Sequence, residues 1–165
     1  MALFLPRDTI PKSQGITEDA SGEDRGGLAS MLQLEFVLPG PPVSYQTSDK
    51  TNLKNWQATV KAKAQKTWTA APLTGKLKFL LINFHEGDKP PLDDDNMVKP
   101  IRDALNKVVY DDDRQIRYSE TLHVPIDDPI KIRRASAILL AAYSKGDEFL
   151  YVRIEDAPDF IQLPG

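Results

Sequence analysis

The sequence predicts an α/β domain of the α+β type, with a single small mixed β-sheet and helices packed on it. Apolar and polar residues alternate over Leu32–Pro42, apolar residues recur at helical spacing over Leu53–Trp68, and Lys76–Glu86 forms a long apolar run. A period of two is typical of strands and a period of 3.6 of helices. Because the two kinds of segment alternate along the chain, the predicted element order is β-α-β-α-β-α-β.

The first half of the domain contains two predicted strands and a helix. The strand over Leu32–Pro42 ends in Pro-Gly-Pro-Pro, which predicts a rigid turn. The run over Lys76–Glu86 is apolar enough to be a central strand of the sheet. Between them, the helix over Leu53–Trp68 has one apolar stripe, formed by Leu53, Trp56, Val60 and Ala64.

The second half continues the alternation. A helix is predicted over Asn96–Val109 and a strand over Arg114–Val124. The apolar face of that helix is formed by Met97, Ile101, Ala104, Leu105 and Val108. A third helix, which includes Ile130 to Tyr143, is predicted to start with Asp128 as its N-cap and Pro129 at its first position. The final strand is Phe149–Glu155.

Composition narrows the class of protein. A chain of 165 residues is long enough for one domain with its own core. The absence of cysteine excludes disulfides and thiolate chemistry, and no apolar run is long enough to span a membrane, so we expect a cytoplasmic protein. Residues 1–30 are polar, rich in glycine and serine, and without periodicity, which predicts a disordered leader before a domain over 31–165.

Charges are segregated along the chain. The net charge is −3, which weakly disfavours a nucleic-acid partner, yet the stretch Lys50–Trp68 holds five lysines and no acid. Six aspartates form two triplets, Asp93–Asp95 and Asp111–Asp113. Carboxylates this close repel one another, so each triplet is either solvated in a loop or helix start, or neutralised by a cation.

A divalent cation is the functional alternative for the triplets, because carboxylate oxygens suit Mg²⁺ or Mn²⁺. Asp93 and Asp95 alternate, so in an extended chain they point the same way, and Asp113 is within reach after the helix. Neither triplet has the glycine and glutamate of an EF-hand calcium loop. Two histidines and no cysteine disfavour a zinc site, and without a glycine-rich phosphate loop we expect no nucleotide cofactor.

Lys99 lies four residues after Asp95 and three before Arg102. These residues would form ordinary helix ion pairs, or they would place positive charge beside a metal and carboxylate cluster, as phosphodiester cleavage requires. Pro100 is unusual here, because it removes a backbone bond to the carbonyl of Asn96.

The segment DDDNMVKPIRDALNKVVYDDDRQI, Asp93–Ile116, resembles the central motif of the RusA family of Holliday junction resolvases. That family has Asp-x-Asp-Asn-x-x-Lys, a helix ending near Asp-Ala-Leu, and a paired Asp-Asp-x-Gln at the next strand. The sequence FVLPGPP, Phe36–Pro42, is similar to the family's opening strand and Pro-Pro turn. The resemblance runs from Leu32 to Val124.

The resemblance implies a homodimeric endonuclease of prokaryotic or phage type, dependent on Mg²⁺ with Mn²⁺ as a substitute. Such an enzyme nicks opposite strands of a four-way DNA junction in recombination and repair. The residues on the family's catalytic positions are Asp93, Asp95, Lys99 and Asp113. The three aspartates would bind the metal, with Asp112 as a further candidate ligand. Asp94 and Asp111 match no required acid.

Basic residues around these positions are candidates for phosphate contacts with branched DNA, or they are simply solvated. They are Lys54, Lys61, Lys63, Lys66, Lys89 and Arg102. Three other functions stay open: a non-catalytic branched-DNA-binding protein, a nuclease that also cuts flaps and forks, and a metal-binding structural module with no nucleic-acid partner.

Overall fold

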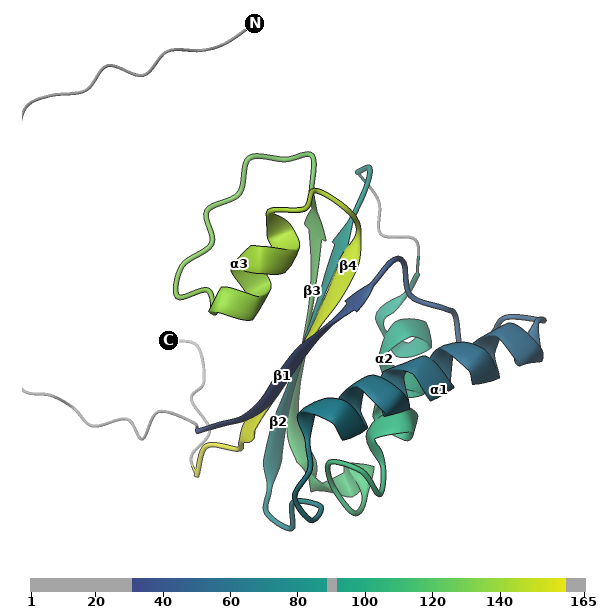
Figure 1. The fold of residues 1–165 in the computed structure, drawn as a ribbon, viewed down its shortest axis with the longest axis vertical. Helices are drawn as coiled ribbons and strands as arrows, with labels where there is room; N and C mark the ends of the chain where they lie inside the picture. The colour runs from purple at the N-terminus through teal and green to yellow at the C-terminus, as the bar shows by residue number, and fades with distance from the viewer. Residues whose placement is uncertain (1–30, 89–91, 160–165) are drawn as a thin grey trace, which may run out of the picture.

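The computed structural model of the chain describes residues 31–88 and 92–159. The expected leader and Lys89 lie outside the described residues. The elements in chain order are β1 (Leu32–Pro39), α1 (Lys50–Thr67), β2 (Leu77–His85), α2 (Asp94–Leu105), the 3₁₀ turn η1 (Asp113–Gln115), β3 (Ile116–Pro125), α3 (Ala137–Tyr143) and β4 (Phe149–Asp156) (Figure 1). The predicted order of strands and α-helices is confirmed.

The four strands form one mixed sheet in the order β1-β4-β2-β3. β4 is antiparallel to both β1 and β2, whereas β2 and β3 are parallel. Parallel neighbours need a crossover connection, and α2 forms part of it. The prediction that the apolar strand after α1 is central is confirmed, because β2 lies between β4 and β3.

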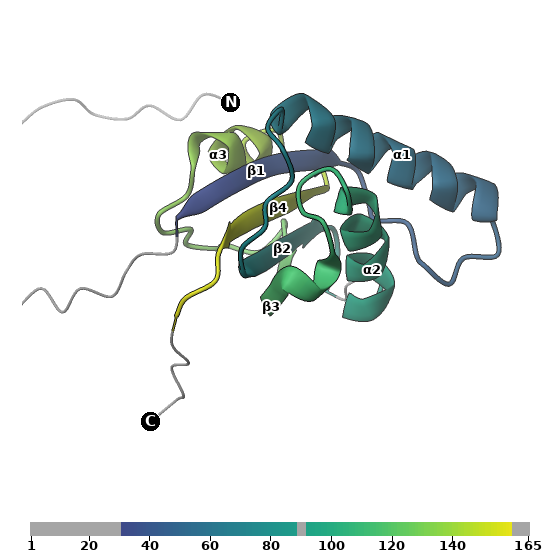
Figure 2. The ribbon, with the colours of Figure 1, turned by 90° about the horizontal axis from the view of Figure 1, so that it is seen from below.

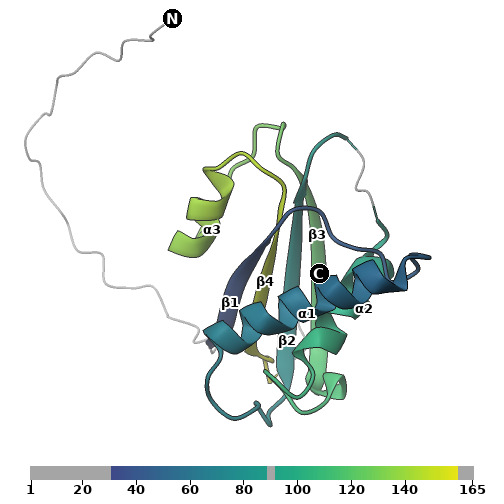
Figure 3. The ribbon, with the colours of Figure 1, turned by 45° about the vertical axis from the view of Figure 1, so that its right-hand side comes forward.

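The two faces of the sheet carry separate cores. Successive strand residues point to opposite faces, so Phe36 and Leu81 join the core under α1 and α2, whereas Val37 and Ile82 pack in the cluster around α3. Figures 2 and 3 show α1 and α2 together on one side of the sheet and α3 away from them. The inward stripe predicted for α1 is confirmed, with Trp56 only partly buried.

The predicted start of the third helix is wrong. α3 begins at Ala137, and its N-cap is Ser136, whose hydroxyl accepts a hydrogen bond from the Leu139 N–H at 3.3 Å. The preceding segment is irregular, and its alternating Ile130 and Ile132 pack against the second core as extended chain does. Asp128 and Pro129 therefore begin no helix, because Ile130 and Ile132 pack against the second core instead.

α2 begins at Asp94, two residues earlier than predicted, and it ends at Leu105, before the predicted end at Val109. The chain leaves it through a turn in which Lys107 has a positive φ of 64° and its N–H bonds the Tyr110 carbonyl at 2.7 Å. Val108 therefore belongs to this turn and not to the helix, and the return to Asp113 is not extended.

None of the helices in the described part of the chain combines the length and the hydropathy that crossing a membrane requires.

Candidate active site

The first aspartate triplet forms the beginning of α2. Asp93 is the N-cap, and its carboxylate makes no hydrogen bond to the helix that it caps. Asp94 and Asp95 lie in the first turn, where the helix dipole favours negative charge. The extended chain assumed for Asp93 and Asp95 is not what the structure has, because α2 begins at Asp94 and Asp95 is already helical.

Asp94 links α2 to the edge strand β3. Its Oδ1 lies 2.6 Å from Nε2 of His123. The Asn83 side-chain nitrogen lies 3.4 Å from Nδ1 of the same imidazole. Because an amide nitrogen only donates, Nδ1 accepts and Nε2 carries the proton that is donated to Asp94. Asp94 therefore holds the start of α2 in place.

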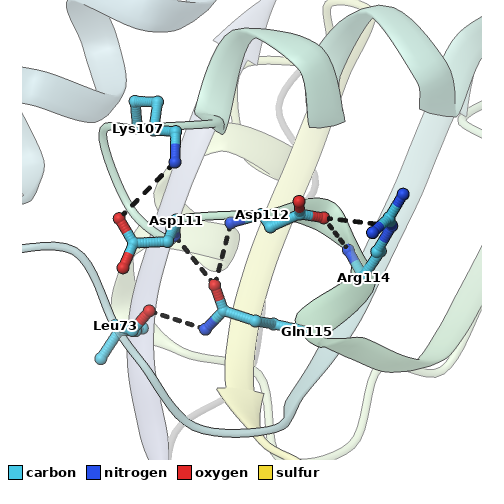
Figure 4. A network of polar contacts seen from close by, with 6 residues as sticks. All are labelled: Leu73, Lys107, Asp111, Asp112, Arg114 and Gln115. Carbon is cyan, nitrogen blue, oxygen red and sulfur yellow. Dashed lines mark hydrogen bonds and ion pairs between the residues drawn. The ribbon is translucent and has the colours of Figure 1, made fainter.

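Two members of the second triplet also have structural partners (Figure 4). Asp111 lies 3.9 Å from the ammonium of Lys107. Asp112 caps η1, and its carboxylate accepts a hydrogen bond from the Arg114 N–H at 2.9 Å. That backbone hydrogen bond lowers the pKa of Asp112 below its ordinary value, because it stabilises the ionised form.

Gln115 holds the backbone of the second triplet. Its side-chain oxygen accepts hydrogen bonds from the N–H groups of Asp111 and Asp112, at 2.9 and 3.0 Å. Its side-chain nitrogen donates to the carbonyls of Leu73 and Gly75, at 2.7 and 3.0 Å. Gln115 therefore ties the triplet to the segment that precedes β2.

One aspartate from each triplet lines the same cavity. An open cavity of about 330 Å³ lies between α2 and η1. Its lining residues are Asp95, Val98, Lys99, Arg102, Asp103 and Asp113. Of the predicted site residues, Asp95, Lys99 and Asp113 come together here with Arg102. Asp93 and Asp112 are not among the lining residues.

The cations of the cavity have defined partners. Lys99 pairs with Asp103, one turn further along α2, at 3.3 Å, and not with Asp95. Arg102 donates from Nη2 to the backbone carbonyl of Asp113 at 3.2 Å, which links α2 to η1. The Arg102 carbonyl accepts a hydrogen bond from the Tyr110 hydroxyl at 2.9 Å. Burial raises the pKa of Tyr110, so this hydroxyl remains a donor.

The candidate DNA-binding lysines of α1 divide into two groups. All four are exposed. Gln57 donates to a backbone carbonyl of α2 at 3.4 Å, which shows which flank of α1 faces α2. At about 100° per residue, Lys54 and Lys61 lie within roughly 60° of Gln57 around the helix axis. Lys63 and Lys66 lie roughly 120° or more away from it, on the other flank.

The cavity suits a hard divalent cation. Within residues 31–88 and 92–159, no group of three or more acidic, histidine or cysteine side chains gathers closely enough to hold a metal ion. Mg²⁺ usually keeps several waters and binds one or two carboxylates together with substrate oxygens. Asp95 and Asp113 both line the cavity, so the type and the number of these donors are compatible with Mg²⁺.

Sequence reasoning missed two residues near the cavity. Asp103 was detectable, because it lies four residues after Lys99 on a predicted helix and such pairs face each other. Tyr45, whose ring lies 5.2 Å from the Lys99 ammonium, belongs to the irregular segment between β1 and α1. No local pattern connects Tyr45 to a lysine more than fifty residues later.

A known protein family matches the part of the chain that lines the cavity. The model of the family described as endodeoxyribonuclease RusA matches residues 40–133, which is more than half of the chain and includes both triplets and Lys99. No individual curated protein matches the chain significantly. The match ends before α3 and β4, in agreement with the resemblance seen in the sequence. The chain belongs to the RusA family of endodeoxyribonucleases.

Proposed function

We propose that this chain is a Mg²⁺-dependent endodeoxyribonuclease that resolves four-way DNA junctions by paired nicks. Membership of the RusA family supports nuclease activity on junctions. The observation that carries the proposal is the cavity between α2 and η1, which is lined by Asp95 and Asp113 beside Lys99 and Arg102.

The proposed reaction is hydrolysis of a phosphodiester. A water oxygen forms a bond to phosphorus, the bond from phosphorus to one sugar oxygen breaks, and the proton lost by the water is balanced by the proton gained at the leaving oxygen. Asp95 and Asp113 would hold Mg²⁺, which would supply positive charge at the phosphate and acidify water. Lys99 and Arg102 donate hydrogen bonds to the phosphate oxygens as negative charge accumulates on them.

Asp93 remains part of the proposal as a further ligand to the same cation. Its carboxylate is exposed and is not used for capping α2, so it is available for binding. Its assignment depends on the family resemblance, and an Asp93→Asn variant tests it.

The DNA is expected to approach along the flank of α1 that faces α2. Lys54 and Lys61 lie on that flank and can contact phosphates without reading bases. A homodimer would present two such sites related by a two-fold axis, which suits the near-symmetry of a four-way junction. Light scattering on the purified protein, with and without junction DNA, measures the oligomeric state.

The decisive experiment uses a synthetic four-way junction, a flap, a fork and a linear duplex of related sequence. Each is incubated with the protein in Mg²⁺, in Mn²⁺ and in EDTA, beside Asp95→Asn and the matched control Asp111→Asn. We expect paired nicks on the junction in either metal, no cleavage in EDTA or with Asp95→Asn, and unchanged cleavage with Asp111→Asn.

Other outcomes correct the proposal in defined ways. Equal cleavage of flaps and forks would replace the junction resolvase by a broader structure-specific nuclease. Tight junction binding without cleavage in any divalent metal would leave a non-catalytic DNA-binding protein. Cleavage that persists in EDTA would refute the role of the cation.

A further inference from the structure

Pro100 changes the hydrogen bonding of α2 beside the cavity. A proline has no N–H, so the carbonyl of Asn96, four residues earlier, lacks its helical partner. The backbone N–H of Tyr45 donates to that carbonyl instead, at 2.9 Å. The segment between β1 and α1 is thereby attached to the first turns of α2, where Asp95 and Lys99 lie.

The Tyr45 side chain lies against the proposed catalytic lysine. The Lys99 ammonium is 5.2 Å from the centre of the Tyr45 ring, and the Lys50 ammonium is 5.9 Å from it. Lys50 also donates to the Tyr45 carbonyl at 3.2 Å. Tyr45 is 40% exposed and belongs to neither core cluster, so these contacts and its backbone hydrogen bond are its anchors.

Lys99 thus lies between two different attractive groups. Asp103 binds the ammonium as a hydrogen-bonding anion and neutralises its charge. The Tyr45 ring attracts the cation through its negative face, yet it accepts no proton and leaves the positive charge intact. A lysine held only by Asp103 would be drawn along α2, whereas the ring provides a second fixed point. Because a free lysine side chain has many rotamers, this restraint lowers the entropy lost when the ammonium meets a phosphate.

We propose that Tyr45 is a positioning residue, which holds the Lys99 ammonium at the cavity through its aromatic ring. The catalytic part of this inference rests on the proposed function, in which Lys99 contacts the phosphate. The contact between the ring and the ammonium does not depend on that function. Pro100 contributes by leaving the Asn96 carbonyl free to fix the Tyr45 backbone.

The kinetic test compares Tyr45→Leu, which removes the aromatic face and keeps apolar bulk, with the matched control Tyr45→Phe, which keeps the ring. We expect Tyr45→Leu to lower kcat on a four-way junction about fivefold, with KM and the thermal midpoint little changed. Tyr45→Phe should stay within about twofold of the wild type, because the hydroxyl is not needed for the contact. In a Lys99→Ala background, Tyr45→Leu should cause no further loss, because the residue through which it acts is absent.

A second readout needs no activity. The side-chain ε-methylene protons of Lys99, assigned by their disappearance in Lys99→Ala, should show an upfield ring-current shift in the NMR spectrum. Tyr45→Phe should retain that shift and Tyr45→Leu should abolish it. A folded Tyr45→Leu protein with an unchanged Lys99 signal, or independent losses in the double variant, would overturn the positioning role alone. A wild-type protein that shows the shift but cleaves no junction would instead refute the proposed function and the catalytic purpose of the contact.

Discussion

The two aspartate triplets look alike in sequence and differ in what the fold does with them. In the first, the backbone is helical from Asp94 on, and one side chain is tied to the sheet through His123. In the second, the backbone is held from outside by Gln115, and one side chain caps a 3₁₀ turn. Each triplet nevertheless supplies one carboxylate, Asp95 or Asp113, to the same cavity.

The difference shows that crowding of acids does not reveal which acid lines the cavity. In each triplet, an aspartate outside the cavity has a partner that stabilises the local fold: Asp94 with His123, Asp111 with Lys107, and Asp112 with the Arg114 N–H. These partners offset the repulsion within each triplet. The acids that line the cavity are those whose charge a cation would offset.

An asparagine scan of all six aspartates tests this division most severely. We expect Asp95→Asn and Asp113→Asn to lower the initial rate of junction cleavage by about 10²- to 10³-fold or more, because ligands and local negative charge are lost. Asp94→Asn, Asp111→Asn and Asp112→Asn keep an acceptor oxygen for their structural partners and should stay within a few-fold of wild type. A large loss at Asp94, Asp111 or Asp112 would break the comparison, and Asp93→Asn decides whether a third acid belongs to the site.

Two lysines allow an equally matched test. Lys99 and Lys107 each pair with an aspartate four residues later, Asp103 and Asp111, at 3.3 and 3.9 Å. Only Lys99 lines the cavity, so Lys99→Ala should lower kcat about 10²-fold, through loss of charge at the phosphate. Lys107→Ala removes a surface ion pair. It should change neither the activation free energy of cleavage nor the free energy of unfolding by more than about 1 kcal/mol. Equal losses in the two variants would indicate a general electrostatic effect and no specific role for Lys99.

The side chain of Gln115 should stabilise the fold through the second triplet and not through the first. Gln115→Ala breaks four hydrogen bonds that hold the chain around Asp111–Asp113, so we expect a loss of about 2–3 kcal/mol in the free energy of unfolding. Gln57→Ala is the control, because Gln57 donates a single hydrogen bond at 3.4 Å and should cost about 1 kcal/mol or less. Urea unfolding measures both variants, and an equal effect would mean that Gln115 does not organise the triplet.

The sequence predicted the element order because a period-two pattern marks β1, a period-3.6 pattern marks α1, and apolar runs mark β2 and β4. It placed the start of α3 too early, because Asp128 and Pro129 are good helix-starting residues, whereas Ile130 and Ile132 pack on the second core from an irregular segment. A short segment of sequence shows the residues that favour a helix start, but it does not show the energy gained by packing in the folded protein.

The site was predictable in part for a related reason. Residue type and order placed the whole first triplet among the candidates, and only the resemblance to the family motif separated Asp95 from Asp94. That distinction depends on the direction of one helical turn and on His123 in a strand far along the chain. The role of Tyr45 depends on a carbonyl freed by Pro100, which no pattern around Tyr45 reveals.

The smallest expected effect is the pH dependence contributed by Asp112. Its pKa in the folded protein is lowered, first by the hydrogen bond from the Arg114 N–H, relative to the unfolded value of about 3.9. A carboxyl with a depressed folded pKa stabilises the fold fully above its unfolded pKa, and that stabilisation is lost as the pH falls through the folded pKa. Asp112→Asn keeps an acceptor oxygen but cannot ionise, so the stability difference between wild type and variant should shrink from pH 6 toward pH 2. Denaturant unfolding across that range measures it, and parallel stability curves would show that the charge of Asp112 contributes nothing to η1.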